Sequence, residues 1–523
     1  MSLVWRFKLA DRWKRSAAKT RRRVATDRPT SRGAAAGDHY VSPLVMRNAS
    51  PEMAALFSPR CRALTWRRVW LALAEAQREA GLPITTTQIR ALRAGLEKID
   101  LAAAARHERR TRHDLMAHLH AYADVAPIAR PVLHLGATSM DIVDNADLWL
   151  MREALRRVRD WLLNVVVALA DLAKKYRDLP CVGFTHYQPA QPTTLGKRAA
   201  LWCWDFLGDL EEIDRLERGL AFRGIRGATG TQASFLQLAG DETTQQRARD
   251  RALDRAARRV ERIETAVAKK LGFERIEPVT GQTYSRKTDG RVMAALAGVA
   301  ASVHKFANDV RLLANLREVA EPFERGQVGS SAMPYKRNPM LCERATGLSR
   351  FVICLSQSAW QTAAEQWLER TLDDSSNKRL IVPEAFLATD GMLQIVLHVS
   401  RGLVVFPRVM RARLEAELPF LATEAVMMAA AKAGGDRQSL HERLRGHALA
   451  AAKRVYEQGA ANDLPERLRR DEVFADVSWD EVFDVKRHIG LAPRQVDSFL
   501  GDVIGPLRKR FSRVPRMRPR IDV

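Results

Sequence analysis

Apolar side chains recur at intervals of three and four residues over unusually long stretches of this chain. One series runs from Leu148 to Tyr176, a second from Val292 to Leu313, and a weaker one from about Ala199 to Leu220. Helices in globular proteins average about 11–12 residues, so stripes of this length are uncommon. A repeat sustained this far predicts a bundle of long, nearly parallel helices. Strand signals are sparse in the sequence, and we therefore expect an all-α fold.

The chain has 523 residues, enough to build more than one hydrophobic core. We expect residues 1–38 to form a basic tail and residues 39–138 an N-terminal helical domain. Residues 139–404 carry the long apolar series and form the central bundle domain. Residues 405–523 return to shorter helices, and we assign them to a C-terminal helical domain with a basic tail.

The formal net charge of +24 is high enough to suggest nucleic-acid binding, but its distribution argues against that function. Residues 1–33 hold eleven Lys and Arg against two Asp, and residues 508–520 hold seven Lys and Arg and no acidic residue. Most of the excess charge therefore lies near the two ends, which we expect to be solvated. An Arg-rich stretch at 240–264 also contains Asp and Glu, which favours an exposed helix with local ion pairs.

Five scattered cysteines form no close pairs in the sequence: Cys61, Cys181, Cys203, Cys342 and Cys354. This pattern is typical of a reducing compartment and argues against a disulfide framework or a zinc site. No stretch approaches the roughly 20 uninterrupted apolar residues of a membrane span, so no membrane contact is predicted. We expect a cytoplasmic protein, with organellar targeting by the basic N-terminal residues as the alternative.

One polar segment combines hydroxyl groups with cationic and amide side chains. Residues 329–340 read GSSAMPYKRNPM, and the glycine, the two serines and Pro334 interrupt regular structure. Lys336 and Asn338 follow at once. Such a loop can bring a hydroxyl group and several anion-binding donors to one small molecule.

Two further polar segments stand beside the long apolar series. Residues 136–141 read GATSMD, in which Ser139 or Asp141 can cap the next helix, whose N-terminus then favours an anion. Residues 185–192 read THYQPAQP and place His186 in a Pro-bounded polar loop. A histidine in such a loop is a candidate for proton transfer.

Together the three polar segments resemble the signature stretches of the fumarase/aspartase superfamily. Four more stretches are similar to adenylosuccinate lyases: RHDLMAH at 112–118, TGQTYSRK at 280–287, ERTLDDS at 369–375 and GGDRQ at 434–438. The similarity extends from about Ser42 to Phe474. It implies a fumarase/aspartase-like fold of three helical domains, a homotetramer with a shared helical core, active sites built from several subunits, and no cofactor.

The resemblance implies elimination of fumarate from adenylosuccinate, giving AMP, and from succinyl-aminoimidazole carboxamide ribotide. A base must take a proton from a weak carbon acid, and an acid must protonate the leaving nitrogen. By the resemblance Ser330 is the base and His186 the general acid. Lys336 would assist the serine, Glu343 would orient a catalytic histidine, and His113 would lie near the phosphate of the substrate.

A substrate with a phosphate and two carboxylates needs a cationic site, and the planar guanidinium fork suits such groups. The resemblance assigns substrate contacts to Arg47, Asn48, Arg112, Asp114, Thr138, Ser139, Gln282, Asn338, Arg344, Arg370, Ser375 and Arg379. Asn48 departs from the family pattern, because close relatives have a tyrosine there and this chain lacks its ring. The spacing of His113, His118 and His120 does not stack two imidazoles on one helical face, so no metal site is expected.

Two other classes of function remain open at this point. Another superfamily lyase, such as one acting on argininosuccinate, would share the three signature segments but not the stretches at 112–118 and 280–287. A basic helical nucleic-acid-binding protein would show affinity that falls steeply with salt and that survives Ser330→Ala.

Overall fold

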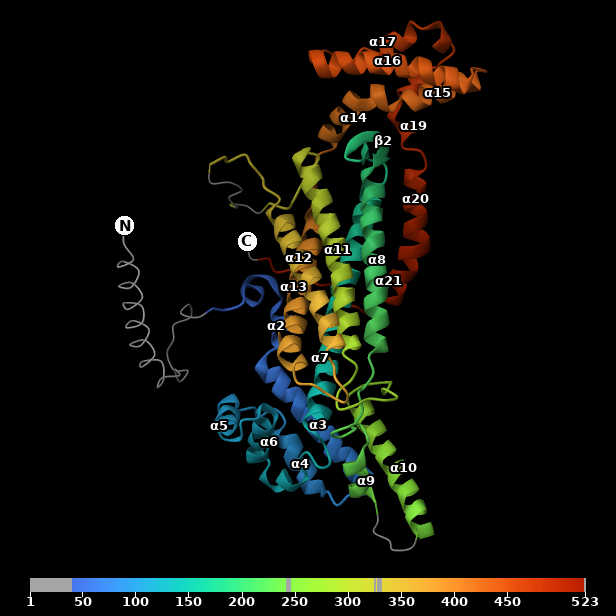
Figure 1. The fold of residues 1–523 in the computed structure, drawn as a ribbon. Helices are drawn as coiled ribbons and strands as arrows, with labels where there is room; N and C mark the ends of the chain where they lie inside the picture. The colour runs from blue at the N-terminus through green and yellow to red at the C-terminus, as the bar shows by residue number, and fades with distance from the viewer. Residues whose placement is uncertain (1–39, 241–245, 324–325, 327–331, 522–523) are drawn as a thin grey trace, which may run out of the picture.

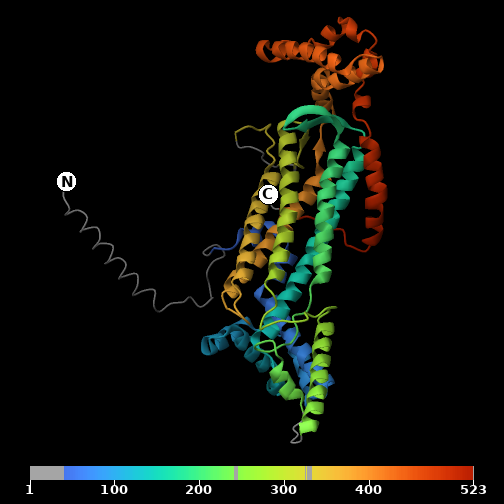
Figure 2. The same ribbon diagram turned by 45° about the vertical axis from the view of Figure 1, so that its right-hand side comes forward.

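The computed structural model describes residues 40–240, 246–323, 326 and 332–521. Five long helices run side by side along the molecule (Figures 1 and 2). They are α7 (Ser139–Lys175), α8 (Leu195–Gly219), α11 (Lys287–Asn315), α12 (Met340–Ala364) and α13 (Asp374–Gly402). The three apolar series fall on α7, α11 and α8, so the predicted long-helix bundle and the all-α fold class are confirmed.

The lower end of the bundle, as drawn in Figure 1, is covered by two groups of shorter helices. The first group is α3 (Pro59–Glu79), α4 (Thr86–Gly95), α5 (Leu101–Thr111), α6 (Asp114–Val125) and the 3-10 turn η2 (Pro127–Val132). The second group is α9 (Ala233–Ala239) and α10 (Gln246–Lys270). A π-turn, η1 (Leu44–Asn48), and α2 (Pro51–Leu56) precede them and lie against the bundle.

The upper end carries a β-hairpin and a separate helical unit. The hairpin pairs β1 (Pro180–Thr185) with β2 (Gln188–Thr194), and a second short pair joins β3 (Val319–Ala320) to β4 (Val404–Val405). The helices above are α14 (Pro407–Leu421), α15 (Thr423–Lys432), α16 (Arg437–Gln458), α17 (Leu464–Arg469), η3 (Glu472–Phe474), α18 (Trp479–Val482) and α19 (Val485–His488). This unit has its own core, which includes Leu418, Leu440, Leu444 and Phe474.

Local sequence explains where several of these helices begin. Ser58 accepts a hydrogen bond from the Cys61 amide at 3.1 Å and so caps α3, while Thr85 and Gln88 form a capping box at the start of α4. Gly196 lets the start of α8 pass close to the end of α7. A Cβ atom at this position would lie 2.4 Å from Arg177 Cα and 2.6 Å from the Ala173 carbonyl oxygen.

The Arg-rich stretch forms most of α10, which is amphipathic. Ala256, Val260, Ile263 and Val267 are buried against α3 and α9. Arg251, Arg255, Arg258 and Arg262 are exposed, whereas Arg259 is half-buried and donates to the Ala239 carbonyl oxygen at 2.9 Å. α13 alone, within the described parts of the chain, is long and apolar enough to cross a membrane. Since 83% of its apolar window is buried, packing in the bundle accounts for this character.

The basic C-terminal residues form an ordered segment on the bundle, and their Lys and Arg side chains are exposed. After α20 (Ala492–Ser498), η4 (Phe499–Ile504) and α21 (Gly505–Arg510), the chain returns along the bundle. We call residues 508–521 the C-terminal strap. Its apolar side chains pack on the main core, and Asn164 on α7 accepts a hydrogen bond from the Met517 amide at 3.0 Å. This packing was not predicted, because arginines separate the four apolar residues of the strap: Phe511, Val514, Met517 and Ile521.

Candidate active site

A cavity of about 720 Å³ opens at the lower end of the bundle, between α5, α6, the start of α7 and the start of α13. We call it the lower cavity. Residues far apart in the sequence meet there, and nine of the predicted site residues line it. They are Arg112, His113, Asp114, Thr138, Ser139, Gln282, Arg370, Ser375 and Arg379.

His113 is held at the N-cap of α6 with its imidazole directed to the start of α7. Its Nδ1 accepts a hydrogen bond from the Met116 amide at 3.5 Å, and its Nε2 lies 3.3 Å from Ser139 Oγ. In a neutral imidazole the nitrogen that does not accept carries the proton. Nε2 is therefore the donor to Ser139, and the backbone fixes the tautomer.

Asp114 and Arg379 form the rim of the lower cavity. Arg379 Nη2 donates to Asp114 Oδ2 at 2.8 Å, joining α6 to α13. Burial alone would raise the pKa of Asp114, but the charge of Arg379 and the hydrogen bond from the Leu115 amide outweigh burial and lower it. Asp114 is thus an anion that positions Arg379.

The first turn of α7 lies at the lower cavity, which Thr138, Ser139 and Met140 line. The Thr138 amide donates to Asp141 Oδ2 at 2.7 Å, so Asp141 provides the capping contact, while Ser139 contacts His113 instead. Asp141 is fully buried and 2.5 Å from Arg223 Nη1. The positive end of the α7 dipole faces the cavity here, and it favours a bound anion.

Gln282 and Arg370 are coupled on the opposite wall. Arg370 Nη1 donates to Gln282 Oε1 at 2.8 Å, and Gln282 Nε2 donates to the Ala228 carbonyl oxygen at 2.8 Å. Because the carboxamide holds Arg370 without neutralising it, the guanidinium keeps its charge for a ligand.

A buried charged cluster supports the cavity from behind, and the sequence analysis did not single it out. Arg286 Nη2 lies 3.0 Å from Asp144 Oδ1 and 2.6 Å from Asp374 Oδ2, and Lys378 Nζ lies 2.8 Å from Asp147 Oδ2. Burial would raise the pKa of Asp144, yet the charges of Arg286 and Lys378 hold it below its ordinary value. The signal available in the sequence was the pair Asp144 and Asp147, which are acidic residues just ahead of a long apolar stripe.

His186 lies at the upper end and not in a simple loop as predicted. It is the first residue of the two-residue turn between β1 and β2, where His186 and Tyr187 both have positive φ, 52° and 57°. Two successive left-handed residues make the turn type that matches the twist of a hairpin. His186 is exposed at this tip, and the prolines at 189 and 192 hid the strand from the sequence analysis.

The segment before α12 also lies at the upper end (Figure 1). Ser330 lies outside the described residues. Lys336 is exposed, Asn338 and Arg344 are half-buried, and Glu343 is exposed in the first turn of α12. Glu321 fixes this turn, because its carboxylate accepts hydrogen bonds from the Leu341 amide at 3.0 Å and the Cys342 amide at 2.6 Å. Burial raises the pKa of Glu321.

Arg47 and Asn48 form a third group, on η1 beside the middle of α13. The Asn48 carbonyl oxygen accepts from Gln394 Nε2 at 3.1 Å, its side chain donates to the Pro43 carbonyl oxygen, and Arg47 is exposed. Neither residue lines the lower cavity. A single chain therefore gathers nine of the predicted residues and leaves His186, Lys336, Asn338, Glu343, Arg344, Arg47 and Asn48 elsewhere. Among the described residues, three or more His, Cys, Asp or Glu are nowhere grouped so as to hold a metal ion.

Comparison with known proteins identifies the class first. A family model described as Lyase matches residues 69–239 and 252–354, which is more than half of the chain. The structure is similar to the crystal structure of a fumarate lyase from Mesorhizobium sp. BNC1, with a TM-score of 0.73 and 25% sequence identity. The alignment covers 88% of this chain and 99% of the fumarate lyase. The chain thus belongs to the lyases of the fumarase/aspartase superfamily.

The particular family follows from two more findings. A model described as Adenylosuccinate lyase C-terminus matches residues 419–499. The adenylosuccinate lyase of Saccharomyces cerevisiae is 47% identical over 88% of this chain and 94% of its own length. That of Schistosoma mansoni is 42% identical over 90% of this chain and 96% of its own length. The chain belongs to the adenylosuccinate lyase family.

Proposed function

We propose that this protein is a carbon–nitrogen lyase that eliminates fumarate from adenylosuccinate, giving AMP. The observation that carries this proposal is similarity along almost the whole chain to relatives that are all named adenylosuccinate lyase. We extend the proposal to succinyl-aminoimidazole carboxamide ribotide, which has the same succinyl–nitrogen bond. Both reactions belong to purine nucleotide biosynthesis. The readings as an argininosuccinate lyase or a nucleic-acid-binding protein are not favoured by these relatives.

The lower cavity supports a role in holding the anionic substrate. The α7 N-terminus, Arg112, Arg370 and Arg379 offer donors on several sides of one space. His113 donates from Nε2 at the same wall, so a phosphate or carboxylate oxygen can take the place of Ser139 Oγ as its acceptor. Gln282 holds Arg370 and Asp114 holds Arg379, which lowers the reorganisation needed when the substrate binds.

The proton transfers are assigned to the upper-end groups. Ser330 would remove the proton from the carbon next to the developing dianion, with Lys336 favouring the alkoxide. His186 would deliver a proton to the leaving nitrogen, and Glu343 would orient a catalytic histidine. Donors around the substrate carboxylate would stabilise the dianion that forms between the two transfers.

We further propose that the complete site forms only in a homotetramer. α7 has 37 residues, so at 1.5 Å per residue it separates Ser139 from the start of the hairpin by about 55 Å. His186 therefore cannot reach the lower cavity of its own chain. Large apolar side chains are exposed on the bundle helices, including Leu201 on α8, Leu312 on α11 and Phe351 on α12. Packing of further copies on these faces would bury them and bring one chain's upper end to another's lower end.

A fumarate-release assay tests the activity. We expect release from adenylosuccinate and none from argininosuccinate when each is supplied separately. Release from argininosuccinate alone, or from neither compound, would contradict the proposal.

Mixing two inactive variants tests the shared site. His113→Ala and His186→Ala should each be nearly inactive alone, and subunit exchange between them should restore activity because some mixed sites contain both histidines. Native mass measurement on the same samples checks for a tetramer. Failure of the mixture to regain activity despite proven exchange would contradict a site shared between chains.

We propose a cytoplasmic location. The cysteines at 61, 181, 203, 342 and 354 are all free thiols in the structure, which supports a reducing compartment. Cell fractionation of the full chain checks this, and enrichment in an organelle would support the targeting role considered for the basic N-terminal residues.

A further inference from the structure

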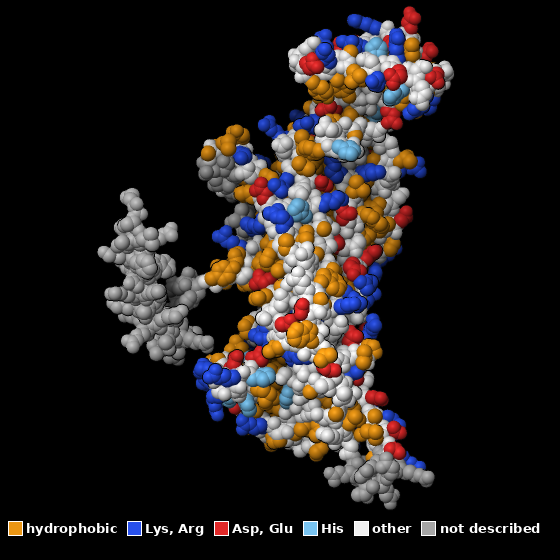
Figure 3. Space-filling model, viewed as in Figure 1, with side chains coloured by type: hydrophobic (Ala, Val, Ile, Leu, Met, Phe, Trp, Pro, Cys, Tyr) orange, Lys and Arg blue, Asp and Glu red, His pale blue; other side chains and the backbone are white. Residues whose placement is uncertain are grey.

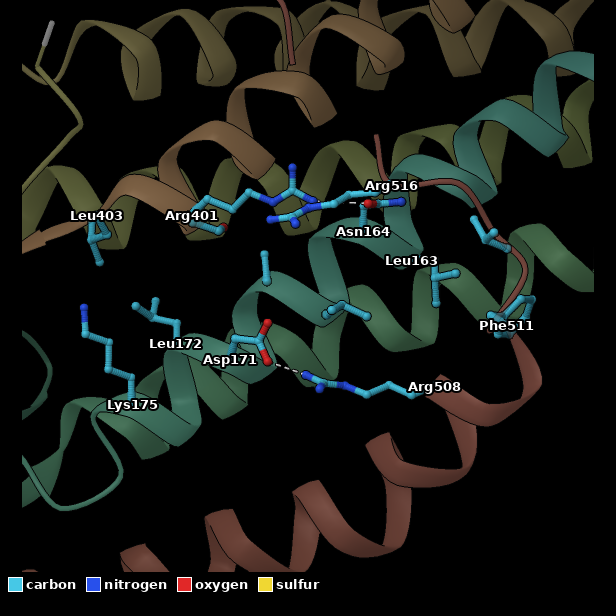
Figure 4. Close-up of a pocket in the computed structure, with 14 residues that line it drawn as sticks. Leu163, Asn164, Asp171, Leu172, Lys175, Arg401, Leu403, Arg508, Phe511 and Arg516 are labelled. Carbon is cyan, nitrogen blue, oxygen red and sulfur yellow. Dashed lines mark hydrogen bonds and ion pairs between the residues drawn. The ribbon is translucent and has the colours of Figure 1, made fainter. Parts of the chain in front are cut away.

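A second cavity lies between the bundle and the C-terminal strap, and no residue predicted for the lyase reaction lines it. It has a volume of about 590 Å³ and is bounded by the second half of α7, the end of α13 and the strap (Figure 4). We call it the strap cavity. Asp171 of this cavity and Ser139 of the lower cavity lie about 48 Å apart along α7, so the two cavities are separate.

Cations dominate the polar lining of the strap cavity. Lys175, Arg401, Arg508 and Arg516 line it, and Asp171 is the one carboxylate among the lining residues. Arg508 is paired with Asp171 in an ion pair. Three positive charges are therefore left without a carboxylate from the cavity lining.

Arg401 and Arg516 bring their guanidinium groups toward each other (Figure 4). Arg401 is held there by neutral acceptors, the Met517 carbonyl oxygen at 2.8 Å and Asn164 Oδ1 at 3.2 Å. Burial and then the charge of Arg516 lower the pKa of Arg401, while Asp171 opposes them. Two like charges held together by neutral groups are stabilised when an anion lies between them.

Apart from Asn164 and Ser400, the rest of the lining is apolar. Leu163, Val167, Leu172 and Phe511 form a wall beside the cationic side. A volume of about 590 Å³ lies within the roughly 300–1,000 Å³ that small-molecule sites occupy, and it exceeds the needs of a single inorganic anion. The wall can therefore take an apolar or aromatic group attached to the anion.

We propose that the strap cavity binds an organic phosphate of nucleotide type, with its phosphate groups between Arg401 and Arg516 and its ring against the apolar wall. The proposal goes beyond the lyase reaction and does not depend on it. The ligand would join α13 to the strap, because Arg401 and Arg516 belong to these two segments. Binding should therefore reduce the motion of the strap on the bundle.

Calorimetric titration of the full-length protein with ADP, and separately with inorganic pyrophosphate, tests the proposal. Hydrogen exchange of peptides covering the strap locates the binding, so that occupancy of the lower cavity is not mistaken for it. We expect both probes to slow exchange in the strap, and ADP to bind more tightly than pyrophosphate because only ADP has a ring for the wall. Unchanged exchange with both probes, or pyrophosphate binding without ADP binding, would overturn the proposal.

Paired variants sharpen the test. Arg401→Gln with Arg516→Gln removes the cavity charges and should weaken the strap-linked binding by about tenfold or more, because charge-assisted hydrogen bonds are lost. Arg513→Gln with Arg518→Gln removes the same charge from strap residues that do not line the cavity and should leave binding unchanged. Equal loss in both double variants would show a general charge effect and overturn the site.

A single variant guards against misfolding. Arg516 is exposed, so Arg516→Glu should fold normally while placing a negative charge beside Arg401. We expect it to abolish protection of the strap by ADP while fumarate release without ADP stays at the parent level. Full protection in Arg516→Glu would contradict the proposed position of the phosphate.

Discussion

The two ends of the bundle are built on opposite plans. At the lower end, polar groups of the cavity are paired within the chain, as Asp114 is with Arg379 and Gln282 with Arg370. A buried cluster of Asp144, Arg286, Asp374 and Lys378 lies behind them. At the upper end, the side chains of His186, in the β1–β2 turn, and Lys336, in the segment before α12, are exposed. Under the proposed function, the binding groups are positioned within one chain, whereas the proton-transfer groups would enter a complete site only when subunits assemble.

The largest effect is expected from the upper end. His186→Ala should lower the turnover of adenylosuccinate by about 10²–10⁴-fold, the usual contribution of a general acid. Since the side chain is exposed at a hairpin tip, the free energy of unfolding should change little. Steady-state kinetics and urea unfolding of the same sample check both statements.

The control for this variant is His441→Ala, which removes another exposed histidine from α16 and should leave turnover unchanged. Ser330→Ala should match His186→Ala in turnover. Near-normal turnover in both Ser330→Ala and His186→Ala would contradict the assignment of these residues as base and acid.

The lower end should respond in the opposite way. Arg286→Met removes the cation between two buried carboxylates and should lower the free energy of unfolding by about 3–5 kcal/mol. Urea unfolding measures this loss. A variant as stable as the parent would mean that the cluster is not a structural support, and the contrast between the two ends would fail.

The rim of the lower cavity tests binding separately from chemistry. Arg379→Gln should raise the KM for adenylosuccinate by about tenfold to a hundredfold, with a smaller change in kcat, because a charged donor to the substrate is lost. Arg350→Gln on α12 removes an exposed arginine outside the cavity and serves as the control. A fall in kcat alone would place Arg379 in the chemical step.

A charged contact at Asp471 in the upper helical unit gives a pH-dependent prediction. Asp471 accepts from Arg443 Nε at 2.6 Å and lies 2.6 Å from His447 Nε2, and these contacts lower its pKa to about 2. In the unfolded chain the pKa of an Asp is about 3.9. Because the pKa of Asp471 is lower in the folded state, its ionised carboxylate stabilises the fold above that pH, and this stabilisation is lost as the pH falls towards 2. Asp471→Asn should thus cost about 2 kcal/mol at pH 7.

Urea unfolding at pH 7 and at pH 3 checks this difference, which should narrow at the lower pH. A constant difference between parent and variant at both pH values would contradict the linkage. His447→Gln is the companion variant, since it keeps Asp471 ionised and should preserve most of the pH dependence.

Thr85→Ala should have the smallest effect. It removes one side of the capping box of α4, away from the lower cavity, and should lower the free energy of unfolding by about 1 kcal/mol without changing KM. A changed KM would show that the lower end transmits small shifts to its cavity.

The sequence predicted the long helices better than the segments that connect or cover them. The apolar series from Leu148 to Tyr176 lies on α7. Apolar residues that recur every three to four positions over such a length are buried together only when the segment forms one long, packed helix. The β1–β2 hairpin was missed, since its prolines and short length resemble a loop. The strap was missed because its arginines masked the four apolar residues that pack on the core.

The candidate site shows the same limit. Residues of the motifs recognised separately at 112–118, 136–141, 280–287 and 369–375 do meet in one cavity. Nothing in local spacing could reveal that His186 would stand at the far end of α7, because that separation depends on how the helices run. The cluster around Arg286 was missed for another reason. The sequence alone does not distinguish a charged residue that is buried from one that is exposed to solvent.

The tight crossing at Gly196 has a consequence for variants of this protein. A methyl group added there would collide with the backbone of Ala173 and Arg177, and the turn leading into β1 would have to move. His186 would be carried with it, although the altered atom touches no substrate. An inactive protein with alanine at this position would therefore look like a catalytic mutant in an assay, and only its displaced hairpin would reveal a steric origin.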